Sequence, residues 1–128
     1  MQYLKGLLFL FTLLCYYPAF SQIKDTISLV AFFLGGNDSL RRFVKKNFHE
    51  PDSIPNIYFT KKGSVRFVIK QDGTPGSFEI VEKVGYKYDE EMIRILKLTK
   101  WQPAIENGNY YEWPITYEYI ITIDLAEN

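Results

Sequence analysis

Residues 110–124 read YYEWPITYEYIITID and carry the longest strand signal in the chain. Apolar or aromatic side chains alternate there with polar ones, and this period of two predicts a half-buried strand. The predicted inward face carries Ile115, Tyr117, Tyr119, Ile121 and Ile123, and the opposite face carries Thr116, Glu118 and Thr122. Because Pro114 has no N–H to donate to a ladder, we expect this strand at a sheet edge or bulged near the proline.

A hairpin is predicted earlier in the chain, on the two sides of the Asp72-Gly73 pair. Apolar and polar residues alternate over residues 64–70 and again over residues 77–82. Asp-Gly tolerates the positive φ angles of a tight turn, so these two strands should pair antiparallel. The Lys-Lys-Gly stretch at residues 61–63 is expected to be a break before the first of them.

Two amphipathic helices are predicted, one leading to Phe48 and one from Asp89 to about Lys100. The first has Asn37 or Asp38 as its N-cap, after a sharp entry at Gly35-Gly36, and its apolar positions are Leu40, Phe43, Val44 and Phe48. Its cations Arg41, Arg42, Lys45 and Lys46 could form a nucleic-acid patch, but a solvated helix face is the favoured interpretation. The second has Asp89 as its N-cap and Glu90 and Glu91 in its first turn, where the helix dipole favours anions.

The first 21 residues have the anatomy of a secretory signal peptide: Lys5, an apolar run over residues 7–17, and a small-x-small ending at Ala19 and Ser21. A membrane-spanning helix needs roughly 20 apolar residues, so an uncleaved anchor is the weaker alternative. Cys15, the only cysteine, could be a lipidation site, but leucines rather than small residues precede it. Residues 22–34 are expected to be a short strand or lead-in to one domain over residues 35–128.

Composition excludes several classes of function. The chain has 128 residues, which leaves room for one domain, and its formal net charge of zero excludes a strong general field for nucleic acid. His49 is the only histidine, and no common nucleophile, phosphate-loop, dinucleotide or zinc-protease motif occurs. We therefore expect no catalytic residue, cofactor or metal. A small secreted hydrolase is also considered, and this hypothesis requires a cleft that joins His49 to a carboxylate.

Residues 35–123 resemble the C-terminal domain of the TonB energy transducer, in the version common in the Bacteroidetes. The resemblance rests on the order and spacing of short landmarks: Gly35-Gly36, GSVRF at 63–67, Asp72-Gly73, the Asp89 helix, KWQPA at 100–104, Asn107-Gly108 and WPITY at 113–117. It implies an α+β fold with two layers, in which two helices pack on a small antiparallel sheet.

The resemblance also implies a function. Such a domain of a Gram-negative bacterium works in the periplasm, is not an enzyme, and binds an extended segment of an outer-membrane TonB-dependent transporter, or of another envelope protein, by adding it as a strand to its sheet. The implied docking edge is the last strand, with Trp113, Ile115, Thr116, Tyr117, Glu118, Tyr119, Ile121 and Ile123. Tyr117 and Tyr119 could provide specificity or pack in the core. The alternative is a structural or homodimerising envelope protein that pairs through the same strand.

Two departures from the family pattern limit what is expected. Residues 22–34 would span only about 45 Å when fully extended, which is too short to bridge two membranes. The Tyr-Pro pair that precedes the first sheet strand in the family is Glu50-Pro51 here. We therefore expect this chain to bind a partner without transducing energy alone.

Overall fold

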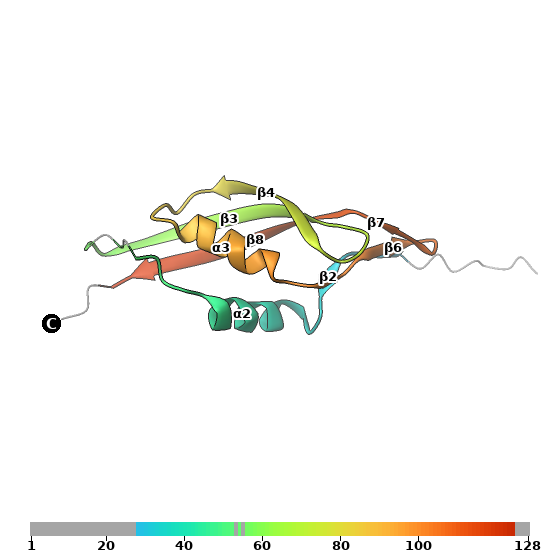
Figure 1. Cartoon of the computed structure of the whole chain (residues 1–128), viewed down its shortest axis with the longest axis horizontal. Coiled ribbons are helices and arrows are strands. Elements are labelled where there is room, and N and C mark those ends of the chain that lie inside the picture. Colours follow the sequence, from blue (N-terminus) through green and yellow to red (C-terminus); the bar gives the residue numbers. More distant parts are fainter. Residues whose placement is uncertain (1–27, 53, 55, 125–128) are drawn as a thin grey trace, which may run out of the picture.

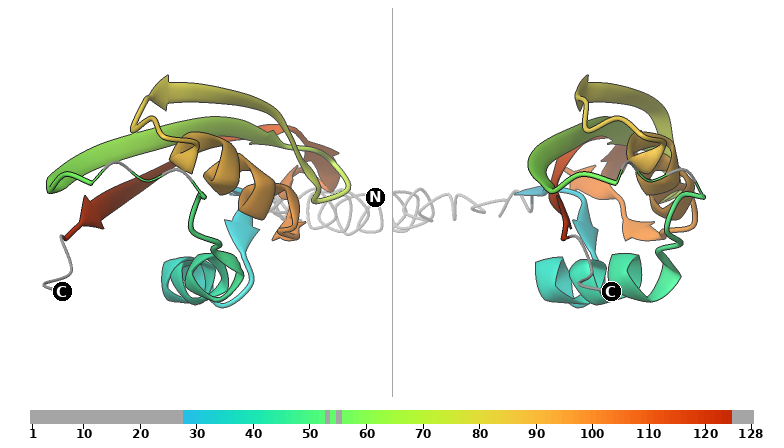
Figure 2. Two further views of the ribbon diagram at one scale, coloured as in Figure 1. Left: turned by 60° about the vertical axis from the view of Figure 1, so that its left-hand side comes forward. Right: turned by 90° about the vertical axis from the view of Figure 1, so that its left-hand side faces the viewer.

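A computed structural model describes residues 28–52, 54 and 56–124. In this part of the chain, helices α2 (Gly36–Asn47) and α3 (Tyr88–Lys97) pack on an antiparallel sheet of three strands, ordered β4-β3-β8 (Figure 1). The strands are β3 (Phe59–Ile69), β4 (Pro75–Glu82) and β8 (Trp113–Ile123). Both helices lie on the same side of the curved sheet (Figure 2, right). The predicted two-layer α+β fold is confirmed, whereas the predicted signal peptide lies outside the described residues.

Neither helix has the length and hydropathy of a membrane-spanning segment.

The strand predicted over residues 110–124 is confirmed as β8, but it starts later, at Trp113, because residues 109–111 form a separate short strand. Strand β8 pairs with β3 without interruption, from Phe59 opposite Ile123 to Ile69 opposite Trp113. Strand β3 is longer than expected, and the predicted break at residues 61–63 is wrong. Gly63 lies directly opposite Tyr119, and a Cβ on it would overlap the tyrosine ring. The glycine therefore makes room for a side chain within the strand and does not end it.

The predicted hairpin between β3 and β4 is confirmed. At its tip Gly73 has φ +83°, and the Asp72 carboxylate accepts hydrogen bonds from the N–H and hydroxyl of Thr74. The Trp101 N–H donates to the Gly73 carbonyl oxygen at 2.9 Å, and a Cβ on Gly73 would overlap the Trp101 carbonyl. The tip of the hairpin is thus docked against a residue almost thirty positions later in the chain.

The predicted N-caps of both helices are wrong. Helix α2 begins after Gly35, which has φ +84°, so that Asn37 and Asp38 already lie in its first turn. Helix α3 begins after Lys87, which has φ +65°, and ends at Lys97 instead of Lys100. In both cases a left-handed residue sets the start, and no side chain caps it.

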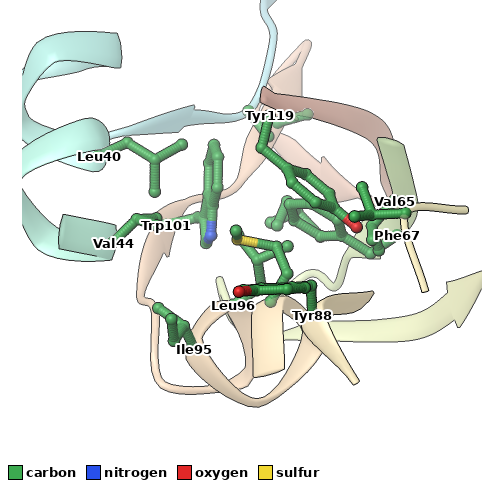
Figure 3. Close-up of a cluster of buried hydrophobic side chains, with 14 residues drawn as sticks. Leu40, Val44, Val65, Phe67, Tyr88, Ile95, Leu96, Trp101 and Tyr119 are labelled. Carbon is green, nitrogen blue, oxygen red and sulfur yellow. The ribbon is translucent and has the colours of Figure 1, made fainter. Parts of the chain in front are cut away.

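Trp101 connects the layers of the core. Its ring meets Phe33 edge-on at 5.5 Å and Phe67 at 5.7 Å between centroids. Figure 3 shows Leu40 and Val44 of α2 facing this ring. The core therefore draws side chains from both helices and from the sheet.

Short strands lie beside this core, two of them within residues 22–34, where a short strand or lead-in was expected. Two pairs of residues in the lead-in, β1 (Ser28–Leu29) and β2 (Phe32–Phe33), pair with β6 (Ala104–Glu106) and β5 (Trp101–Gln102). The strand β7 (Asn109–Tyr111) follows a turn at Asn107-Gly108, where both residues have positive φ, and pairs with β6. The lead-in is thus tied to the segment that follows α3.

Candidate partner-binding edge

Strand β8 is an edge of the β4-β3-β8 sheet. Its one strand neighbour among the described residues is β3, and this pairing runs through all eleven residues of β8 without a register shift. Pro114 lies opposite Val68 within the ladder, so the expectation of an edge strand is confirmed and the alternative of a bulge is not needed. An edge strand presents a row of backbone N–H and C=O groups on its open side.

The other edge of the sheet, β4, is irregular. Its pairing with β3 shifts register twice, between Ser64 and Val65 and between Arg66 and Val68, and Ser77 has φ +53°. Bulges twist a strand and disrupt the regular spacing of its free backbone groups. The open edge of β8 is therefore the regular one of the two.

Tyr119 packs in the core and is not available at the surface. It is 7% exposed, and its hydroxyl donates to Asp89 Oδ1 at 2.5 Å. Burial and the adjacent Asp89 carboxylate raise the pKa of Tyr119, so the hydroxyl keeps its proton. Of the two predicted tyrosines, Tyr119 therefore has the structural role, whereas Tyr117, stacked on it at 6.4 Å between centroids, is half-buried.

The other predicted docking residues follow the alternation along β8. The half-buried face carries Trp113, Ile115, Tyr117, Ile121 and Ile123, and the exposed face carries Thr116 and Glu118. Ile120 also lies on the exposed face and is 68% exposed, although the predicted set omitted it. Its position in the alternation was the signal that could have found it. The structure brings all these residues onto one strand, and their role in binding stays a prediction.

A groove lies between α2 and β8, and we call it the α2–β8 groove. Its larger part has a volume of about 580 Å³ and an apolar lining of Val44, Phe48, Met92, Tyr117, Tyr119 and Ile121. A smaller hollow of about 260 Å³ continues it toward the start of α2, beside Asn37, Leu40 and Thr116. Residues 116–121 of β8 all line one or both hollows, so the groove follows the strand along its length.

Cations border this groove. Lys62 is paired with Glu118 at 2.9 Å across the exposed face of the sheet. Arg41 is 3.9 Å from Asp38, and both of these side chains are more than three-quarters exposed, so the pair is weak. Lys45 has no ion pair with a described residue. Burial raises the pKa of Tyr117, and the positive charge of Arg41 opposes this rise. The groove therefore has excess positive charge on its α2 side.

His49 lies beside a carboxylate that sequence spacing could not reveal. Glu91 Oε1, from α3, is 3.8 Å from His49 Nδ1, and Arg94 Nη2 is 3.1 Å from the same nitrogen. Glu91 accepts hydrogen bonds from Arg94 and from the His49 backbone N–H. These bonds, above all the one from Arg94, lower the pKa of Glu91. A carboxylate held in this way is a poor general base.

His49 shares a hollow with the Glu91 carboxylate, as the hydrolase hypothesis requires. The His49 side chain is 79% exposed, and among the described residues that line this hollow none carries a hydroxyl or thiol. Across residues 28–52, 54 and 56–124, no three His, Cys, Asp or Glu side chains are placed to hold a metal ion. The cluster instead joins the segment after α2 to α3.

Comparison with known protein families gives one match. Residues 62–124 match the family described as Gram-negative bacterial TonB protein C-terminal. The matched region contains β4, α3, all of β8 and most of β3, but it does not include α2. No curated protein matches the chain.

Proposed function

Residues 62–124 belong to the TonB C-terminal family, and from this membership and the open edge of β8 we propose that the protein binds an extended segment of an outer-membrane transporter by strand addition. The family is a periplasmic, transport-associated domain without enzymatic activity, and its members interact with outer-membrane transporters. The protein is accordingly a TonB-like envelope protein. Export through a cleaved signal peptide is part of the proposal.

The regular edge of β8 is the observation that carries this proposal. A peptide that joins such an edge gains main-chain hydrogen bonds, and these give affinity largely independent of its side chains. Eleven consecutive residues of β8 pair with β3 without a register shift, so the free backbone groups of β8 keep the regular spacing that a second partner strand needs. The bulged edge of β4 does not offer this regularity.

NMR titration with transporter-derived extended peptides tests the proposal. We expect the backbone amide signals of residues 113–123 to shift on titration, while those of β4 serve as the control within the molecule. Shifts confined to β4, or no shift in β8 with any such peptide, would contradict strand addition at β8.

Backbone methylation of the peptide sharpens this test. Alternate amides of an added strand point toward the edge, so N-methylation of one alternate set should abolish binding. Methylation of the other set leaves the side chains and the facing amides intact, and binding should persist. Equal loss with both peptides would show that the peptide does not bind as a paired strand.

Pairing of β8 with β8 of a second copy is the alternative function. Ile120 supports this alternative function. Its side chain is 68% exposed, and an apolar side chain on the exposed face of an edge strand becomes covered when two copies associate. Analytical ultracentrifugation distinguishes the two. A stable dimer that does not bind peptides at β8 would favour the structural role. A protein that stays monomeric would exclude pairing of β8 between two copies.

A further inference from the structure

The α2–β8 groove runs beside the open edge at which the proposed partner strand would lie. We propose that this groove selects the partner: it takes an extended segment with two acidic side chains at alternate positions, both facing α2, and an apolar side chain at the end near Phe48. This inference rests on the proposed strand addition. It adds the chemistry of the segment, which strand addition alone leaves open.

The groove has the length of a short strand. It follows residues 116–121 of β8, and six residues of a strand extend about 20 Å. Helix α2 passes beside it at an angle to the strand (Figure 2, left), with Asn37 lining the same hollow as Thr116 and Phe48 lining the same hollow as Ile121. A segment paired with β8 would therefore have one row of side chains facing α2 where the helix passes residues 116–121.

The spacing of the cations sets the spacing of the acidic residues. Arg41 and Lys45 are four residues apart on α2 and so lie on the same face of the helix, about 6 Å apart along its axis. Residues two apart in a strand point to the same side and are separated by about 6.6 Å. Two carboxylates at alternate positions of the segment match this pair of cations, whereas two at adjacent positions would face opposite sides.

The end of the groove near Phe48 requires an apolar side chain. Val44 from α2, Met92 from α3 and Ile121 from β8 line the larger hollow together with Phe48. Glu118, the one carboxylate that borders the groove among the described residues, is already paired with Lys62. The lining therefore offers no anion that would attract a basic segment.

Matched synthetic peptides test the spacing. One set has Glu at alternate positions followed or preceded by Val, a second has the same residues with the two Glu adjacent, and a third has Lys in place of both Glu. At low ionic strength we expect the adjacent-Glu peptide to bind about five- to tenfold more weakly than the alternate-Glu peptide. The Lys peptide should bind at least about tenfold more weakly than the alternate-Glu peptide. Fluorescence anisotropy gives the affinities, and the β8 amide shifts report where each peptide binds.

Charge reversal on α2 tests the residues. The double variant Arg41→Glu, Lys45→Glu should invert the preference, so that the Lys peptide binds more tightly than the alternate-Glu peptide. The control is Arg42→Glu, Lys46→Glu, which changes the same charge at the same spacing on residues outside the groove lining. The control should keep the original preference.

The two proposals fail in different ways. If peptides shift the β8 signals but bind equally whatever the spacing and sign of their charges, the groove does not select and strand addition stands. If both double variants change the preference equally, the net charge of the protein acts instead of the groove, and the inference is wrong. If transporter-derived peptides shift the β8 signals but none of these synthetic peptides does, the inference about the groove is wrong. If neither kind of peptide shifts them, the proposed function itself is wrong.

Discussion

Asp89 is a buried carboxylate whose charge is satisfied by three donors. It is 0% exposed, and it accepts hydrogen bonds from the backbone N–H groups of Val84 and Gly85 and from the Tyr119 hydroxyl. Burial of a charge is costly unless such bonds replace the lost water. Asp89 thereby joins the turn before α3, the start of α3 itself and the middle of β8.

Replacement of Tyr119 by Phe should remove one of these donors. We expect Tyr119→Phe to lower the free energy of unfolding by about 1–3 kcal/mol, because a buried acceptor loses its partner while the ring volume is kept. Urea denaturation followed by circular dichroism measures this. The control is Tyr117→Phe, since the half-buried Tyr117 makes no such bond to Asp89. An equal effect of the two substitutions would contradict the role assigned to the Asp89 bond.

Sequence reasoning placed Asp89 at the start of a helix and could go no further. The carboxylate at that position was expected to cap the helix, but it points back to the turn at Val84 and Gly85. Its third donor, Tyr119, is thirty residues away in the sequence. Helix propensity places such a residue along the chain, whereas its partners depend on how α3 and β8 pack.

At the scale of elements, the tip of the β3–β4 hairpin depends on its contact with Trp101. Gly73 combines a positive φ with a backbone contact to Trp101 that leaves no space for a side chain. This contact ties the hairpin to β5, which in turn pairs with β2. The hairpin is thus fixed at its turn as well as along its strands.

Gly73→Ala should separate the cost of this contact from that of the backbone conformation. Gly108 is the control, because it has a similar φ of +79° but open space around its Cβ position. We expect Gly108→Ala to destabilise the protein by about 1–2 kcal/mol. Gly73→Ala should cost about 3 kcal/mol or more, since the Trp101 backbone must also move. Thermal and urea unfolding check the difference, and equal losses would show that the Trp101 contact adds nothing.

Long elements with a clear period were predicted, whereas the short strands were expected only as a strand or lead-in within residues 22–34 and as the start of the segment at residues 110–124. The alternation over residues 110–124 predicted a strand that the structure has as β8, and the Asp72-Gly73 pair predicted the hairpin. The break expected at residues 61–63 was wrong because Gly63 is needed for space beside Tyr119. Strands of two or three residues, such as β1, β2 and β5, have too few positions to show a period, and tertiary contacts define them.

At the scale of the whole molecule, Glu91 and Arg94 join the two helical segments. Arg94 donates to both carboxylate oxygens of Glu91 and to the Asn47 carbonyl oxygen, while the His49 N–H donates to Glu91. Asn47 is the last residue of α2, so these bonds hold the segment after α2 against α3. The position of α2, and with it one wall of the α2–β8 groove, depends on them.

The lowered pKa of Glu91 predicts loss of stability in acid. The contribution of Glu91 is complete above its ordinary pKa of 4.5 and is lost as the pH falls through the lower folded value. We expect Glu91→Gln to reduce the unfolding free energy by about 1 kcal/mol near neutral pH. The difference from the unmodified protein should narrow below about pH 4. Urea titrations at a series of pH values measure it.

The exposed neighbour Glu90 provides the control for this effect. Glu90→Gln should leave the acid dependence of unfolding close to that of the unmodified protein. A gap between Glu91→Gln and the unmodified protein that stays constant down to pH 3 would contradict the assigned titration of Glu91.

The candidate site was predicted only in part, because local sequence patterns mark an edge strand but not the packing around it. Pro114 and the resemblance both indicated an edge strand, and the edge is where they placed it. The α2–β8 groove was not predicted, because Arg41 and Lys45 were interpreted as part of a solvated helix face. Which face of α2 meets β8 is decided by packing around Trp101 and by the bonds of Glu91, and neither is visible in a local pattern.

The continuous ladder between β3 and β8 also has a mechanical consequence. A strand added to β8 lies along the same direction, so tension along it acts as shear, first on the pairs that it forms with β8 and then on the eleven residue pairs between β8 and β3. Under shear these pairs resist together, whereas a pull across the sheet would peel them apart one after another from the end. Such an edge would hold a partner against a strong pull along the strand. A much weaker pull across the sheet would release the partner.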